Sequence, residues 1–283
     1  ARAESLDFKE GTAFPVSGAV DVSAKLAGSL DAPNVDAEVR ASDLTAYQEA
    51  FGALSATIKV DARTVRVVNL RASMPGGEMV AEEIGIDIDD EMLFGDVRVN
   101  RIDIGAFAHG QKYDLSGLLA GDVRVRGSLD APDIGADFHV DNLIWRGHSL
   151  GGGPIVLSFG GEPQQSSDNV VGLAARLASE GQELLLQASA ALHSETLRAR
   201  LELVDVDVAP WAEMLPKLVP MRGRASGTVL ASGAWTAPDV EANLQVVDLE
   251  SAMASATDDA ATSAGSEIVW HPLGASEIDV HLV

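Results

Sequence analysis

Three segments of this 283-residue chain are copies of one another, and they align without gaps. They read GAVDVSAKLAGSLDAPNVDAEVRASDL from Gly18, GLLAGDVRVRGSLDAPDIGADFHVDNL from Gly117, and GRASGTVLASGAWTAPDVEANLQVVDL from Gly223. The copies begin 99 and then 106 residues apart. A repeat of this kind predicts an array of one supersecondary unit, because stacked copies can share a continuous apolar surface that one copy alone cannot bury.

Apolar and polar residues alternate within each copy. Counted from Pro33, Pro132 and Pro238, the second, fourth, sixth and eighth residues are apolar in all three copies, and the fifth and seventh are polar. This period of two is typical of a strand with one buried face. The stretch GSLDAP lies between two such runs, where glycine permits a turn and proline cannot donate to a sheet ladder. Each copy therefore predicts a strand, a turn and a second strand.

Alternation continues through the rest of each period and indicates about five or six strands per repeat. Short helical or irregular crossings are expected at GAFAHGQKYDL from Gly105 and APWAEMLPKLVP from Ala209, where Phe107 and Trp211 would be packing anchors. We assign residues 1–16 to the end of a preceding repeat, 17–116 and 117–222 to two repeats, and 223–283 to a partial third. Its Ala-, Ser-, Thr- and Asp-rich insert, 251–267, is expected to be a flexible loop. Neither end of the sequence has a terminating signal, so we interpret the chain as a segment of a longer polypeptide.

Composition excludes several classes of function. The formal net charge of −23 disfavours nucleic-acid binding, which depends on Lys and Arg neutralising phosphates, and it would repel anionic lipid headgroups. The chain has no cysteine, so disulfides, thiol catalysis and thiolate metal sites are excluded. The six histidines have no ligand spacing, and the acidic stretch IDIDDEM from Ile86 lacks the spacing of a calcium loop. We expect no metal and no cofactor.

One short motif suggests an enzyme. Residues Gly147 to Gly151 fit the G-x-S-x-G pattern of a serine hydrolase, in which Ser149 would be the nucleophile. That elbow needs a strand before the serine and a helix after it, whereas GGGPIVLSFGG follows here. The first copy has TAYQEAFGAL at this place, without an equivalent motif. We interpret the motif as a glycine-rich turn between two strands, and we expect no catalytic residue and no enzymatic activity.

A sheet with one apolar face must cover that face. No long amphipathic helix is available, so a closed barrel, a sandwich or a lengthwise-folded trough remain. Stacked repeats favour the trough, and we expect an all-β, elongated repeating β-groove with an apolar interior and a polar exterior. A lining of Ala, Val, Leu and Ile with few aromatic residues suits acyl chains. The repeat pattern alone leaves open whether this face is a ligand groove or a dry packed core.

The pattern G-S-L-x-A-P followed by a strand ending in D-L, together with a seam such as DVDVAPWAEMLP, resembles the TamB family of the translocation and assembly module. That family lies within the wider AsmA-like and bridge-like lipid-transfer proteins. The resemblance covers Ser17 to Leu249 and implies a periplasmic β-groove through which phospholipids move between the inner and outer bacterial membranes. It also implies an inner-membrane anchor and a C-terminal region that meets an outer-membrane barrel protein, neither of which is in this chain. The alternative is a structural or assembly β-array with a dry core, acting in outer-membrane protein biogenesis or adhesion.

The lining follows from the alternation in each copy and in the runs between copies. The residues that we assign to a lipid-binding lining are Val20, Val22, Leu26, Val35, Ala37, Val39, Ile84, Ile86, Ile88, Val97, Val99, Val123, Val125, Ile134, Ala136, Phe138, Val140, Leu184, Leu186, Leu197, Leu201, Leu203, Val240, Ala242, Leu244 and Val246. Transport along such a lining is expected to be passive.

Overall fold

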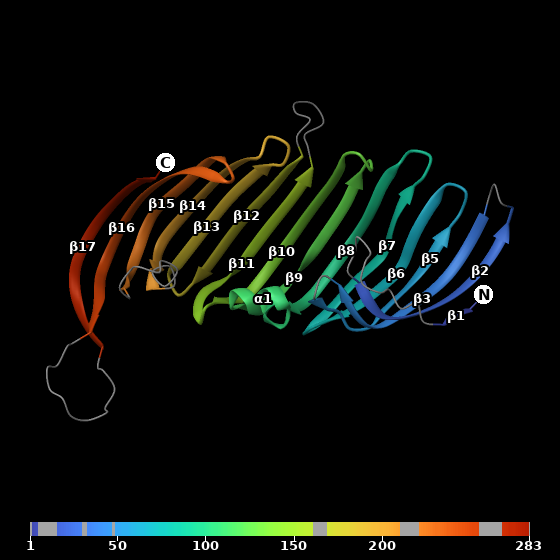
Figure 1. Cartoon of the computed structure of the whole chain (residues 1–283), viewed down its shortest axis with the longest axis horizontal. Helices are drawn as coiled ribbons and strands as arrows, with labels where there is room; N and C mark the ends of the chain where they lie inside the picture. The colour runs from blue at the N-terminus through green and yellow to red at the C-terminus, as the bar shows by residue number, and fades with distance from the viewer. Residues whose placement is uncertain are drawn as a thin grey trace, which may run out of the picture.

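The computed structural model describes residues 2–4, 16–29, 33–46, 49–160, 169–209, 221–254 and 268–282. These residues form one 17-stranded sheet in which sequence neighbours pair antiparallel. The pairings run from β1 and β2 at one end of the molecule to β16 and β17 at the other, so the sheet is open rather than a closed barrel (Figure 1). The predicted all-β, lengthwise-curved groove is confirmed as an architecture.

The elements follow one another as a meander. The first repeat contains β2 (Val16–Gly28), β3 (Pro33–Ala46), β4 (Glu49–Ala50), β5 (Leu54–Val60), β6 (Thr64–Met74), β7 (Gly77–Asp87) and β8 (Met92–Asp103), and β1 (Arg2–Glu4) precedes it. A 3₁₀ turn, η1 (Ile104–Ala106), and a short helix, α1 (Ala108–Tyr113), follow. The second repeat contains β9 (Leu115–Gly127), β10 (Pro132–Trp145), β11 (His148–Gly160), β12 (Val170–Ser179), β13 (Gln182–Ala191) and β14 (Thr196–Asp207). The last strands are β15 (Met221–Ala234), β16 (Ala237–Ala254) and β17 (Ile268–Leu282).

The three aligned segments form the same hairpin. β2–β3, β9–β10 and β15–β16 have equivalent registers, since Gly28 pairs with Pro33, Gly127 with Pro132 and Gly233 with Pro238. Six long strands separate the start of one hairpin from the start of the next. An even number of antiparallel strands returns the chain to the same edge of the sheet in the same direction, so every copy can present the same face.

The molecule is thin for its mass. Its accessible surface is 18410 Å², whereas a compact monomer of 29.5 kDa would expose about 11,500 Å². The excess is what a single curved layer produces, because neither face is fully covered by a second layer of structure. Figure 1 shows this layer as one long row of tilted strands.

A row of β-bulges lies in the strands near the edge that carries α1. In β10, Asp141 pairs with Leu118 and Ile144 pairs with Ser116, so β10 has one extra residue, and Asn142 takes the left-handed conformation with φ 51°. The same conformation recurs at Asp43, Asn69, Arg101, Asp205 and Asp248 in β3, β6, β8, β14 and β16. Bulges bend a strand and increase its twist. They therefore curve the sheet at one level along its length.

The bulges explain the glycines and leucines that mark the repeat. Gly117 has φ 156°, and a Cβ atom there would lie 3.3 Å from the carbonyl oxygen of Asn142 and from Cα of Leu143. Equivalent close approaches join Gly18 to Leu44 and Gly223 to Leu249. The glycine of one strand thus leaves room for the bulge of the next in all three copies.

One boundary of the sequence interpretation needs correction. β16 continues to Ala254, so 251–254 are strand rather than loop, and the remainder of the expected insert, 255–267, lies outside the described residues. The seam after β8 contains η1 and α1 as expected, whereas Trp211 and most of the second seam lie outside the described residues. Alternation had ended at the Ser251 composition change, but the ladder with β17 continues from Ser251 to Ala254.

We predict that Asn142→Val lowers the free energy of unfolding by about 1–2 kcal/mol, because a β-branched side chain disfavours the left-handed conformation. Asn142→Gly at the same position should have a smaller effect, since glycine adopts this conformation readily. Urea unfolding followed by circular dichroism measures both. Equal destabilisation by the two substitutions would contradict the assignment of the bend to the left-handed bulge.

Candidate functional site

One face of the sheet is apolar from β2 to β16. Residues that pair across adjacent strands point to the same face of the sheet. Val97 pairs with Val123, and Val123 pairs with Ala136, so all three lie on this face. The row then continues through Leu157, Leu173, Ala188, Ala199, Ala231 and Val240. Parallel rows lie on either side of it. The result is a continuous apolar surface that no single repeat could provide.

The residues assigned to the lining from sequence share this face, with one exception. The registers place Val22 opposite Val39, Leu186 opposite Leu201, and Leu244 opposite Gly227 in the same surface. Ile88 is the exception, because β7 ends at Asp87 and Ile88 lies exposed in the turn that follows. Alternation in IGIDID continued past the end of the strand, which the period of two alone could not detect.

The bulges extend this face beyond what strict alternation predicts. Val140 and Leu143 are an odd number of residues apart, so strict alternation would place their side chains on opposite faces. Both nevertheless belong to the same buried cluster, because the bulge at Asn142 reverses the alternation. Leu203 and Val206 do the same around Asp205. Sequence reasoning missed these residues after the bulges and the apolar positions of β5, β6, β12 and β15. The missed positions include Leu54, Ile58, Val65, Val67, Leu70, Leu143, Val171, Leu173, Leu177, Val206 and Val229.

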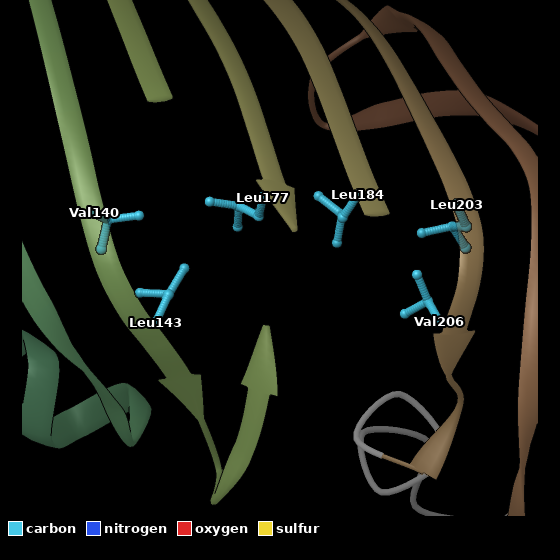
Figure 2. Packing of buried hydrophobic residues seen from close by; sticks show 6 residues of the cluster. All are labelled: Val140, Leu143, Leu177, Leu184, Leu203 and Val206. Carbon is cyan, nitrogen blue, oxygen red and sulfur yellow. The ribbon is translucent and has the colours of Figure 1, made fainter. Parts of the chain in front are cut away.

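The apolar face has a filled floor. Val140, Leu143, Leu177, Leu184, Leu203 and Val206 form a buried cluster, in which Val140 is fully inaccessible. Figure 2 shows Val140 and Leu143 pointing from one side toward Leu203 and Val206 on the other, with Leu177 and Leu184 between them. The six side chains thus form one row across β10, β12, β13 and β14 on the same face of the sheet.

On the same face, apolar side chains are more exposed toward the edge of the sheet opposite α1. Leu157 in β11 is 38% exposed although it pairs with the buried Ala136. Leu26 and Val171 are also exposed on this face. The face thus changes from packed floor to accessible rim along the strands. Apolar side chains that remain accessible beside a packed core are a common property of ligand grooves.

The opposite face is polar and carries cross-strand ion pairs. Arg98 contacts Asp122 at 3.1 Å, Arg126 contacts Asp96 at 2.8 Å, and Arg224 contacts Asp205 at 2.9 Å. Three concavities border this polar face, and that of about 860 Å³ lies over β6 to β9. Its arginines have acidic partners, so it offers no excess of positive charge. Exposed pairs of this kind contribute little stability but keep the face hydrated.

Ser149 does not lie in a nucleophile elbow. It is an exposed residue of β11, where it pairs with Ile144, and an antiparallel strand continues after it. The turn consists of Arg146 and Gly147, both with positive φ. Our interpretation of the whole motif as a turn is therefore wrong beyond Gly147. Gly151 and Gly153 belong to the strand, where a Cβ atom would lie 2.2 Å and 2.0 Å from carbonyl oxygens of β12.

Glu49 of β4 holds the seam between the repeats in place through hydrogen bonds. Its carboxylate accepts hydrogen bonds from the backbone N–H groups of Ala108, at 2.6 Å, and His109, at 3.0 Å, and it contacts the His109 ring. The hydrogen bond with the His109 side chain, followed by these backbone donors, holds the pKa of Glu49 below 4.5. Phe107, expected to be a packing anchor, stacks edge-on against Phe51 with ring centroids 6.4 Å apart.

A second carboxylate fixes the hairpin between β5 and β6. Asp61 accepts hydrogen bonds from the backbone N–H of Arg63, and from the hydroxyl and backbone N–H of Thr64. These bonds favour the charged carboxylate and lower the pKa of Asp61 to about 2.

Among the described residues no group of three or more His, Cys, Asp or Glu side chains is placed to hold a metal ion. No helix in the described ranges has the length and apolar character needed to cross a membrane. Comparison with known proteins found no matching family model, no similar curated protein and no similar solved structure.

We predict that Leu203→Ala, on the floor, lowers the free energy of unfolding by about 2–5 kcal/mol, through lost burial and the cavity left behind. Leu230→Ala, the same substitution at an exposed position of the polar face, should change it by no more than about 0.5 kcal/mol. Urea unfolding of both variants measures the difference. Similar values for the two would show that the cluster is not the packed part of the face.

The stability of the folded protein should depend on pH through Asp61. Because the pKa of Asp61 is depressed in the folded protein, its stabilising contribution is present above the ordinary value of 3.8 and is lost as the pH falls through about 2. Asp61→Asn should therefore unfold at lower urea concentration at pH 7, and the gap between the two proteins should narrow from pH 4 to pH 2. A gap that is independent of pH would contradict this role.

Proposed function

We propose that this chain conducts phospholipids along its apolar face, as part of a bridge-like lipid-transport protein. The supporting observation is a continuous, in-register apolar surface that is packed at its floor and accessible at its rim. A core that existed only for stability would have no need of an accessible apolar rim over so many strands. The resemblance of the repeat to the TamB family supports the same proposal.

The energetics favour acyl chains as the occupant. Each CH₂ group transferred from water to an apolar lining gains about 0.8 kcal/mol. A lining that is similar from β2 to β16 keeps this gain nearly constant along the groove, so a lipid meets no deep trap and no high barrier. The headgroup would remain in water at the open side. Movement is then passive and requires no catalytic group.

The cellular setting belongs to the same proposal. The resemblance supports a periplasmic location, transport between the inner and outer bacterial membranes, and an outer-membrane barrel partner bound through a region outside this chain. The acidic character of the chain is compatible with this role, because the net charge of −23 disfavours adsorption of the protein to anionic membrane surfaces along its length.

The second candidate function is a structural or assembly array with a dry core. The buried cluster around Val140 favours it, because apolar side chains of β10, β12, β13 and β14 are packed in one cluster there (Figure 2). The two candidates differ at the rim. A dry array gains nothing from Leu157, whereas a lipid groove needs it.

The test is a pair of substitutions on one strand. Leu157 on the apolar face and Val156 on the polar face are neighbours in β11, 38% and 42% exposed. We predict that phospholipid co-purifies with the parent protein from a bacterial host, that Leu157→Asp reduces the lipid-to-protein ratio at least about tenfold, and that Val156→Asp leaves it within about twofold. Native mass spectrometry and lipid extraction measure the ratio.

Circular dichroism and urea unfolding provide the control, and both variants should fold because both sites are already exposed. This pair is better than a substitution at Ala136, which is buried and where a charge would unfold the sheet in either case. A well-folded parent protein without lipid, or equal loss of lipid in both variants, would overturn the proposal in favour of the dry array.

A further inference from the structure

Exposed apolar residues gather at the hairpin turns on one long edge of the sheet. Ile88, Leu129, Leu192 and Trp235 are 46%, 53%, 39% and 41% exposed. They lie in the turns β7–β8, β9–β10, β13–β14 and β15–β16, which share the edge opposite α1 (Figure 1). We call these four residues the crest. They lie beyond the ends of the strands and so outside the apolar face described above.

The four residues occupy the same backbone position. Each donates its backbone N–H to the carbonyl of the residue just before the neighbouring strand: Ile88 to Arg63 at 2.6 Å, Leu129 to Glu91 at 3.0 Å, Leu192 to Asn169 at 3.0 Å and Trp235 to Glu195 at 3.1 Å. The antiparallel ladder therefore extends by one residue into each turn. This geometry aligns the crest residues along one line rather than scattering them over the surface.

Local structure does not require large apolar side chains here. Turn positions favour Gly, Pro, Asn, Asp and Ser, and a polar residue would donate the same backbone hydrogen bond. The repeat nevertheless has Leu30, Leu129 and Trp235 at equivalent positions of GSL, GSL and GAW, although Leu30 lies outside the described residues. An apolar residue repeated where it is exposed points to a binding role.

Carboxylates surround the crest. The described turns of this edge, 61–64, 88–91, 128–131, 192–195 and 235–236, contain six acidic residues and one arginine, and that arginine, Arg63, is paired with Asp89 at 2.8 Å. The six are Asp61, Asp89, Asp90, Glu91, Asp130 and Glu195. An apolar line set in negative charge attracts a partner with apolar residues flanked by Lys or Arg. It would repel both an anionic membrane and a second copy of this acidic chain.

The spacing of the crest fits an α-helix. Adjacent turns on one edge are two strands apart, which is about 10 Å. Seven residues of an α-helix span about 10.5 Å. One apolar residue in each heptad of a helix lying along the edge would therefore meet successive crest residues, as at Ile88 and Leu129 or at Leu192 and Trp235.

We propose that the crest is a docking site for a basic amphipathic helix of a partner protein, which lies along this edge of the sheet. The proposal does not depend on lipid conduction, because none of the four residues belongs to the lining that the strands form. A helix bound there would follow the open side of the sheet over several strands and cover its exposed turns.

A model peptide tests the site. The probe is a fluorescein-labelled amphipathic helix of Leu and Lys, about 21 residues long, with the leucines on one face, and its control is a scrambled peptide of the same composition. Fluorescence anisotropy with the purified chain should show binding of the helix that weakens as salt increases. The combined variant Leu129→Ser, Leu192→Ser and Trp235→Ser should bind at least about tenfold more weakly.

Two controls identify the surface. The variant Val156→Ser, Val204→Ser and Leu230→Ser removes three equally exposed apolar side chains from the polar face and should bind within about twofold of the parent. Leu157→Asp should also bind normally, which separates the crest from the apolar groove. The proposal is overturned if the scrambled peptide binds equally well, if the crest variant binds like the parent, or if Leu157→Asp alone abolishes binding. Crest-dependent binding of phosphatidylcholine vesicles without binding of the peptide would also overturn it.

Discussion

The structure depends on keeping one face of the sheet apolar while the chain passes back and forth through 17 strands. A slip of one residue in any pair would move a whole strand's apolar set into water. The bulges at Asn142, Asp205 and their equivalents are the points where this constraint and the curvature of the sheet are satisfied together. They bend the strand, and the residue after the bulge returns its side chain to the apolar face. Gly18, Gly117 and Gly223 leave the room for that bend.

This constraint produces a surface that differs along the strands. Near the bulges the curved sheet brings Val140 and Leu203 into one packed cluster, which supplies the stability that a single layer would otherwise lack. Toward the crest edge Leu157 on the same face stays accessible. The polar face needs only hydration, which its ion pairs between neighbouring strands provide. The packed part and the accessible part of this face thus lie at different levels along the strands.

The architecture was largely predictable from sequence, because period-two alternation and the GSLDAP turns are local signals. The predictions from sequence fail where a residue's position is decided by contacts that are not local in the sequence. Asn69 shifts the parity of β6, so Leu70 and Ala72 face the groove although alternation from Val65 and Val67 predicts otherwise. Ile88 continues an alternation after its strand has ended, and Gly151 and Gly153 sit in a strand because of close contact with β12, which is a tertiary effect. The contact of Glu49 with α1 spans 59 residues and has no local signature.

We propose that the apolar face is an accessible lining for acyl chains, and a polarity-sensitive label on that face tests this directly. The natural chain has no cysteine, so single cysteines can be introduced at Leu157 and, as a control, at Val156, and labelled with a polarity-sensitive fluorophore. On addition of a short-chain phospholipid below its micelle concentration, the emission of the label at position 157 should shift to shorter wavelength, and that of the label at position 156 should not change. Equal responses at the two positions, or no response at either in a folded protein, would show that acyl chains do not bind to this face.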